Sequence, residues 1–210
     1  MRRLAAIAAI GLVALAAGNI CDFDPLYAIG SVPAALGWMA VNFCPQLSSF
    51  GQLPLVLVQV ISTLLDSIAA TMVAAALAIV LSVLGSASIG VENGVVKMAI
   101  RTIANVFRNV PSIAWALLLL LSFKQNEFTG FLALFLATFG QITRFFLDTL
   151  DEVPAGPVEA LRSCGASYWQ IVLQAGIPLV EAGLMSWTLY MVETNIREAT
   201  LVGLLTGTGI

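Results

Sequence analysis

The sequence contains no histidine and few charged residues. Without histidine, the chain lacks the usual acid–base side chain near neutral pH and the commonest metal ligand. Its 9 basic and 12 acidic residues make up 10% of 210 positions, well below the roughly 25% of a soluble domain. We therefore expect no catalytic residues and no metal site, and the composition is unlike that of a soluble domain.

Two further patterns are missing. The chain has no G-x-x-x-x-G-K-[ST] segment, the loop whose backbone amides hold nucleotide phosphates, so any ATP hydrolysis must occur on another chain. It also lacks basic runs and patches of basic and aromatic residues, which are typical of nucleic-acid binding. We expect no cofactor bound by this chain and no nucleic-acid partner.

Long apolar runs fill the rest of the chain, which is 60% hydrophobic. A bilayer core of roughly 30 Å needs about 20 apolar residues per helical span, and the alternating pattern of a transmembrane barrel is absent. The sequence predicts an all-α integral membrane protein in the lipid bilayer. Five spans are expected, near residues 4–21, 67–88, 107–124, 128–148 and 178–197.

Basic residues predict the orientation, because cytoplasmic loops carry an excess of Lys and Arg. A cytoplasmic N-terminus leaves only Lys124 and Arg197 outside. Residues 22–53 then form an outward loop, in which prolines are expected to break any long helix. These prolines are Pro25, Pro33 and Pro45, followed by Pro54.

The N-terminal region has two open alternatives. Met1, Arg2 and Arg3 followed by a short apolar run and small residues are similar to a cleavable signal peptide, which would leave the other spans unchanged. Cys21 and Cys44 lie at or in the outward loop, where a disulfide between them would persist. The alternative is that both are small buried apolar side chains.

Small residues recur at a spacing of four in the predicted span 67–88. Such a stripe lets another helix approach closely, although an alanine-rich helix would show the same pattern. The stripe comprises Ala70, Ala74, Ala78, Ser82 and Ser86.

The chain changes character at Pro111. Before it, Lys97, Arg101 and Arg108 recur among apolar residues as in an interfacial amphipathic helix. After it, the chain is almost wholly apolar up to Lys124. Arg108 is predicted near the inner mouth of the bundle, where it either snorkels to lipid headgroups or contacts substrate.

Two oppositely charged pairs are spaced four residues apart on predicted helices. Arg144 and Asp148 are expected to form a helix-end ion pair. Glu193 and Arg197 either line a pathway or form a salt bridge at the outer interface.

Residues 154–178, which we call the elbow, interrupt the apolar pattern with a half-polar segment. Pro157 suits the first turn of a short helix, with Glu159 in the same turn, and Gly165 suits the left-handed residue that ends it. Ser167 and Gln170 then form a capping box for a second short helix. That helix is expected to end at Gly176 and Pro178, which begin the last span.

The elbow resembles the cytoplasmic EAA loop of ABC importer permeases, in which Glu-Ala-Ala is followed at set separations by Gly and by Ile-x-Leu-Pro. The second Ala, the Ile and the Leu of that pattern are replaced here by Leu161, Ala175 and Ile177. The positions that align with the pattern are Glu159, Ala160, Leu161, Gly165, Ala175, Ile177 and Pro178.

From about Asp66 onward the chain is similar to one subfamily, the phosphonate and phosphite importer permeases. The similarity includes the stretches RNVPSIAWALL, GPVEALRSCGASYWQIV and SWTLYMVETNIREATLVGLLTGTGI. It implies a type I ABC importer transmembrane subunit in the bacterial inner membrane, working as a homodimer. Its partners would be an ABC ATPase dimer, which binds ATP-Mg, and an external substrate-binding protein.

The resemblance also implies roles by position. Residues 1–65 would form the first span and outward loop, and residues 66–210 the permease core. The implied ATPase-coupling residues are Glu159, Ala160, Leu161, Gly165, Ser167 and Pro178. The implied substrate path comprises Arg108, Glu193, Asn195 and Arg197, with Pro111 in a neighbouring motif.

Several alternatives stay open at this stage. Family members continue past the GTGI segment into another apolar span, so we expect a sixth span to be missing from this chain. The cargo could instead be an amino acid or another oxyanion, and the permease could pair with a different chain. A membrane scaffold without transport activity is compatible with composition alone, whereas the elbow favours a transporter.

Overall fold

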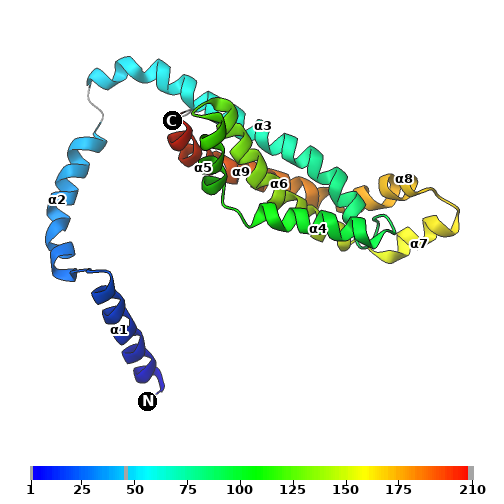
Figure 1. Cartoon of the computed structure of the whole chain (residues 1–210), viewed down its shortest axis with the longest axis horizontal. Coiled ribbons are helices and arrows are strands. Elements are labelled where there is room, and N and C mark those ends of the chain that lie inside the picture. The colour runs from blue at the N-terminus through cyan, green and yellow to red at the C-terminus, as the bar shows by residue number, and fades with distance from the viewer. Residues whose placement is uncertain (1, 45–46, 208–210) are drawn as a thin grey trace. The chain divides into compact units, whose positions relative to one another are not determined.

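A computed structural model describes residues 2–44 and 47–207, and within them all regular structure is helical (Figure 1). The chain divides into two compact units, Met1–Leu53 and Pro54–Ile210. The predicted all-α class is confirmed.

The first unit holds two helices, α1 (Arg2–Ile20) and α2 (Pro25–Phe43), and a 3₁₀ segment, Leu47–Gln52. The sequence predicts that residues 22–53 form an outward loop without a long helix. This is wrong for α2, because its segment Leu26–Phe43 is long and apolar enough to cross a membrane. Asp24 starts this helix because its carboxylate accepts hydrogen bonds from the backbone N–H groups of Leu26 (2.9 Å) and Tyr27 (3.3 Å). Pro45 lies outside the described residues.

Pro33 lies inside α2 without ending it. A proline removes one helical hydrogen bond, but in an apolar setting unwinding the chain would leave several backbone groups unpaired. Continuing the helix is therefore the less costly choice, which explains why the proline rule fails here.

Cys21 and Cys44 are both exposed, free thiols. They flank α2, and a helix of its 19 residues is about 28 Å long, whereas the Cα atoms of a disulfide lie within about 7 Å of each other. The structure thus forms neither of the two alternatives, a disulfide bridge or a pair of buried side chains.

The second unit is a helical bundle. Its helices are α3 (Leu53–Gly85), α4 (Gly94–Arg108), α5 (Ser112–Phe123), α6 (Glu127–Asp151), α7 (Ala155–Ser163), α8 (Tyr168–Ile171) and α9 (Ile177–Thr206). Helices α7 and α8 lie at one end of the bundle and α5 lies toward the other, as Figure 1 shows. At the α5 end, Gln125 connects the loop after α5 to α9, because its Nε2 donates to the backbone oxygen of Leu205 at 3.3 Å.

The small-residue stripe is a packing surface, because its four members on α3 and Ser86, which directly follows α3, are all buried. Ala74 and Ala78 lie in one apolar cluster with Ile142 of α6 and Met191 of α9. The Ser82 hydroxyl donates to the backbone oxygen of Thr143 at 3.1 Å. The stripe therefore brings α3 close to α6 and α9.

The spans differ in part from the prediction. Among the described residues four helices are long and apolar enough to cross a membrane, or five if α4 and α5, which meet at an angle of 87°, count as one broken span. The expected span 107–124 corresponds mainly to α5, whose 12 residues extend only about 18 Å. The described apolar stretch of α1, Ala9–Ile20, is also shorter than a span.

The bend between α4 and α5 has a local cause. Pro111 disfavours helical backbone at the residue before it, so α4 ends at Arg108 and α5 begins at Ser112. Near the bend, α4 approaches α6 at Gly140. A Cβ atom on Gly140 would lie 2.6 Å from the carbonyl carbon of Phe107 and would also contact the backbone nitrogen of Arg108.

Candidate functional site

The elbow begins with α7, a helix of two to three turns that has one buried side. Pro157 lies in its first turn, as predicted. The expectation that Glu159 shares that turn is wrong, because the helix already begins at Ala155. Val158 is buried and Leu161 is half-buried, whereas Glu159 and Ala160 are exposed. Helix α7 therefore rests on the bundle through its apolar side and presents Glu159 and Ala160 outward.

Gly165 ends α7 in the predicted left-handed conformation, with φ of 76°. The Gly165 N–H donates to the Arg162 oxygen (3.0 Å) and the Ala166 N–H donates to the Leu161 oxygen (3.1 Å). These two bonds form a Schellman motif. They fix the direction in which the chain leaves α7.

Ser167 starts α8, where its backbone N–H donates to Gln170 Oε1 at 2.7 Å. This is one bond of the predicted capping box. The expectation that Gly176 and Pro178 end the second short helix is wrong. Instead, α8 passes through a π-helical segment, Val172–Gly176, into α9, so that residues Tyr168–Thr206 form one apolar helical stretch.

The π-helical turn accounts for Gly176 and Pro178. The Ile177 N–H donates to the Val172 oxygen five residues earlier, so the lack of an N–H on Pro178 breaks no regular α-helical ladder. Gly176 leaves room for Ile89, whose Cδ1 would lie 2.6 Å from a Cβ at that position. Gly176 thus permits close packing against Ile89, and Pro178 fits the change from π-helical to α-helical pitch.

The inner side of the elbow packs on the ends of α3 and α6. Val83, Ile89 and Leu150 form one buried cluster with Val158 and Ile171 of the elbow. The Tyr168 hydroxyl adds a hydrogen bond of 3.2 Å to the Val83 oxygen. This packing stabilises helices that are too short to be stable alone.

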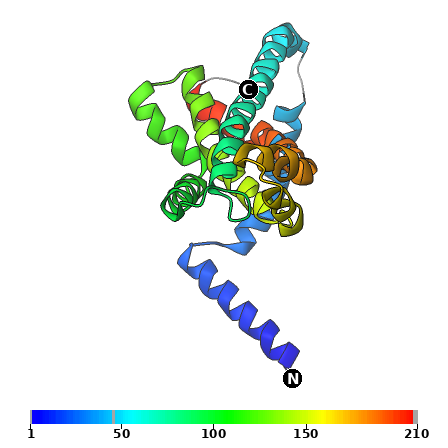
Figure 2. The same ribbon diagram turned by 90° about the vertical axis from the view of Figure 1, so that its right-hand side faces the viewer.

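The outer side of the elbow is open. Trp169 and Leu173 are exposed, although both are large and apolar. A groove of about 410 Å³ lies between the elbow and residues 90–92, and Glu92, Arg162 and Tyr168 are among its lining residues. Figure 2 shows the bundle from this end, with the elbow toward the viewer. The exposed side of α7 and this groove give the elbow an outer surface that another protein can contact.

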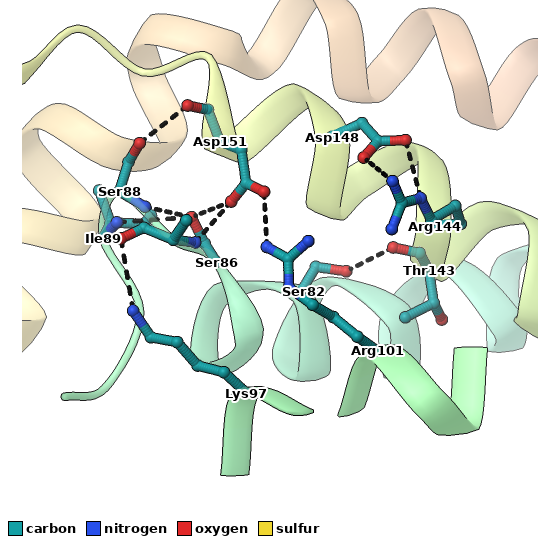
Figure 3. A network of polar contacts seen from close by, with 11 residues as sticks. Ser82, Ser86, Ser88, Ile89, Lys97, Arg101, Thr143, Arg144, Asp148 and Asp151 are labelled. Carbon is teal, nitrogen blue, oxygen red and sulfur yellow. Dashed lines mark hydrogen bonds and ion pairs between the residues drawn. The ribbon is translucent and has the colours of Figure 1, made fainter. Parts of the chain in front are cut away.

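Directly before the elbow, Asp151 forms contacts that the sequence analysis did not single out. Its carboxylate accepts hydrogen bonds from the Ser86 hydroxyl at 3.0 Å and from Arg101 Nη2 at 2.5 Å (Figure 3). Arg101 thus contacts the bundle. One signal was available: an acidic residue in the last turn of a helix opposes the helix dipole, which indicates a specific partner.

Of the four proposed substrate-path residues, only Glu193 and Arg197 contact each other. Asn195 is buried, and its Nδ2 donates to Thr71 Oγ1 (2.8 Å) and Thr138 Oγ1 (2.7 Å). Glu193 and Arg197 form an exposed ion pair of 3.3 Å on another side of α9. Arg108 is exposed at the end of α4 and forms no ion pair with any described residue.

The predicted pair of Arg144 and Asp148 is confirmed, with Nη2 and Oδ1 2.8 Å apart. Both residues belong to α6, so this ion pair connects no two elements.

Sequence comparison gives a family match over most of the second unit. The model of the family "binding-protein-dependent transport system inner membrane component" matches residues 82–210, more than half of the chain. The phosphite transport system permease protein PtxC of Stutzerimonas stutzeri is 30% identical over 150 residues, which cover 71% of this chain and 54% of PtxC. A putative cryptic phosphonate transport system permease protein, PhnE2 of Escherichia coli K12, is 37% identical over 79 residues, covering 38% and 65%. The chain therefore spans about half the length of PtxC.

Solved structures match the fold. A chain of the MetNI methionine ABC transporter, crystallised in inward facing conformations, superposes with a TM-score of 0.69 at 20% identity, covering 76% of this chain and 78% of the other. A chain of an amino acid ABC transporter with histidines gives a TM-score of 0.57 at 18% identity, covering 77% of each chain. At these identities the likeness concerns the fold alone.

Proposed function

The chain belongs to the family of binding-protein-dependent transport system inner membrane components, and from this premise we propose that it carries phosphonate or a related phosphorus oxyanion across the membrane. It is an ABC importer permease with the type I fold. ATP hydrolysis then takes place on a partner ATPase dimer that binds ATP-Mg. The finer statements that follow concern coupling, orientation and cargo.

The elbow is the observation that carries the proposed coupling. Its inner side is fixed to α3 and α6, and its short helix α7 exposes Glu159 and Ala160. A rigid element fixed on one side can transmit a displacement from an ATPase docked on the other. Such coupling requires the nucleotide state to favour one conformation of the bundle.

Orientation follows from charge. Three basic residues lie at the elbow end of the bundle: Lys97 bonds to Ala87, Arg101 bonds to Asp151, and Arg162 lines the groove of the elbow. Cytoplasmic segments are rich in basic residues. This supports a cytoplasmic elbow. We keep the cytoplasmic N-terminus as part of the proposal.

The cargo is inferred from the relatives, whose names concern phosphite and phosphonate transport. Arg108 and Arg197 are exposed cations that an anion would meet if a second copy of the chain completed the pathway. Glu193 partly neutralises the positive field of Arg197. The external binding protein would supply most of the selectivity.

Reconstitution tests the proposed function. The permease, its ATPase and its binding protein are placed in proteoliposomes containing ATP, and uptake of labelled phosphite, methylphosphonate and methionine is compared. We expect ATP-dependent uptake of at least one phosphorus oxyanion and none of methionine. Uptake of methionine alone would replace the proposed cargo with an amino acid, and ATP turnover without any uptake would favour a scaffold.

Recruitment of the ATPase tests the role of the elbow separately. Glu159→Lys reverses the charge on the exposed side of α7, and we expect it to reduce co-purification of the ATPase. Glu152→Lys is the matched control, because Glu152 is exposed and lies just outside the elbow. Equal ATPase recovery with both variants would contradict docking at α7.

A further inference from the structure

Asp151 connects three segments of the bundle at the point where α6 ends and the elbow begins. Oδ1 accepts hydrogen bonds from the Ser86 hydroxyl (3.0 Å) and the Ala87 N–H (2.5 Å), and Oδ2 accepts from Arg101 Nη2 (2.5 Å). The backbone oxygen of Asp151 accepts from the Ser88 hydroxyl at 2.8 Å (Figure 3). We call Ser86, Ala87, Ser88, Arg101 and Asp151 the Asp151 clasp.

The clasp compensates for an unfavourable position. Asp151 is the last residue of α6, where the negative end of the helix dipole disfavours a carboxylate. Only 24% of its side chain and 28% of that of Arg101 are exposed, so both charges are partly removed from water. Charge-assisted hydrogen bonds of this kind are short and geometrically specific, which suits a connection that must keep its shape.

The clasp also holds α4, the first half of the broken α4–α5 pair. Lys97 adds a second link, because its Nζ donates to the backbone oxygen of Ala87 at 3.3 Å. Apolar contacts of α4 accompany these links, because Ile100 and Ala104 pack with Leu147 in one cluster. The polar and apolar contacts together hold residues 86–88, α4 and the end of α6 as one unit.

We propose that Asp151 is a positioning residue that transmits displacement of the elbow to α4, and through the 87° bend to α5. The inference rests on the proposed function, since it requires an ATPase that moves the elbow. Asp148, one turn earlier on α6, has no such role because its partner Arg144 lies on the same helix.

The test uses the complete complex of permease, ATPase and binding protein in proteoliposomes. Two variants break the clasp: Asp151→Asn removes the charge, and Arg101→Gln removes one partner while leaving the bonds of Asp151 to Ser86 and Ala87. Asp148→Asn is the matched control, with the same chemical change on the same helix. Arg101→Lys restores the charge.

The readout is the ratio of ATP hydrolysis stimulated by the loaded binding protein to basal hydrolysis, which reports coupling whatever the cargo is. We expect the ratio to fall about fivefold or more in Arg101→Gln and Asp151→Asn, in the range of typical coupling between sites. Asp148→Asn should match the wild type, and Arg101→Lys should recover part of the ratio.

A normal ratio in Arg101→Gln would overturn the inference and leave the proposed function intact. If Asp151→Asn does not assemble, Arg101→Gln alone decides. A wild-type complex that shows normal stimulation but imports no phosphorus oxyanion would overturn the proposed cargo, and the comparison of variants would still stand. An equal loss of the ratio in Asp148→Asn would show a general charge effect and would also overturn the inference.

Discussion

Asn195 lies two positions after Glu193 on α9, yet the two side chains have opposite surroundings. Asn195 is 1% exposed and hydrogen-bonds to Thr71 of α3 and Thr138 of α6. The Glu193 side chain is 70% exposed. The two residues therefore have separate roles, although one sequence motif contains both.

Replacing Asn195 with leucine should lower the stability of the bundle. The variant removes hydrogen bonds that join three helices, and such bonds contribute about 0.6 to 1.7 kcal/mol in membrane proteins. Thermal unfolding in detergent measures the effect. Glu193→Gln is the control and should leave the unfolding temperature unchanged, because an exposed ion pair contributes little. Equal unfolding temperatures for both variants would contradict the structural role of Asn195.

Gly140→Ala should destabilise the contact between α6 and α4. The added Cβ would lie 2.6 Å from a backbone carbon of Phe107, and a backbone cannot move aside as a flexible side chain can. We expect a loss of about 1 to 3 kcal/mol, as for other overpacked sites. Gly94→Ala, where a Cβ meets nothing within 4 Å, is the control for the same unfolding measurement.

Gly165→Val should disrupt the elbow corner. The left-handed φ of 76° at this position is unfavourable for residues with a Cβ, most of all for β-branched ones. Because nothing lies within 4 Å of the position, the effect should come from the backbone alone. We expect reduced stimulation of the ATPase in Gly165→Val and near-normal stimulation in Gly165→Asn, since asparagine tolerates this conformation. Full stimulation of the ATPase in Gly165→Val would contradict the need for a left-handed residue at this corner.

Cys21, Cys44 and Cys164 should all react with a thiol-alkylating reagent, because all three are free and exposed. Intact mass measured after alkylation without reductant should equal the mass measured after reduction and alkylation. A difference of two alkyl groups between these masses would show that Cys21 and Cys44 form a disulfide.

Local features of the elbow could be predicted from the residues alone. Pro157, Gly165 and the Ser167–Gln170 cap act through their own backbone geometry, and the structure has them as the sequence implied. The buried stripe of α3 was also predictable, because a spacing of four keeps its small residues on one side of the helix. The segment α2 was missed, because the rule that proline breaks helices assumes that water can pair the freed backbone groups.

The sequence was sufficient to show a helical membrane protein with a folded elbow, since apolar length and turn chemistry are local properties of the chain. It could not show which partner each polar side chain finds. Asp151 pairs with Arg101 fifty positions away, and Asn195 pairs with Thr71 more than a hundred positions away. These pairs exist only because α3, α4, α6 and α9 pack side by side, and the elbow is connected to the bundle through that packing.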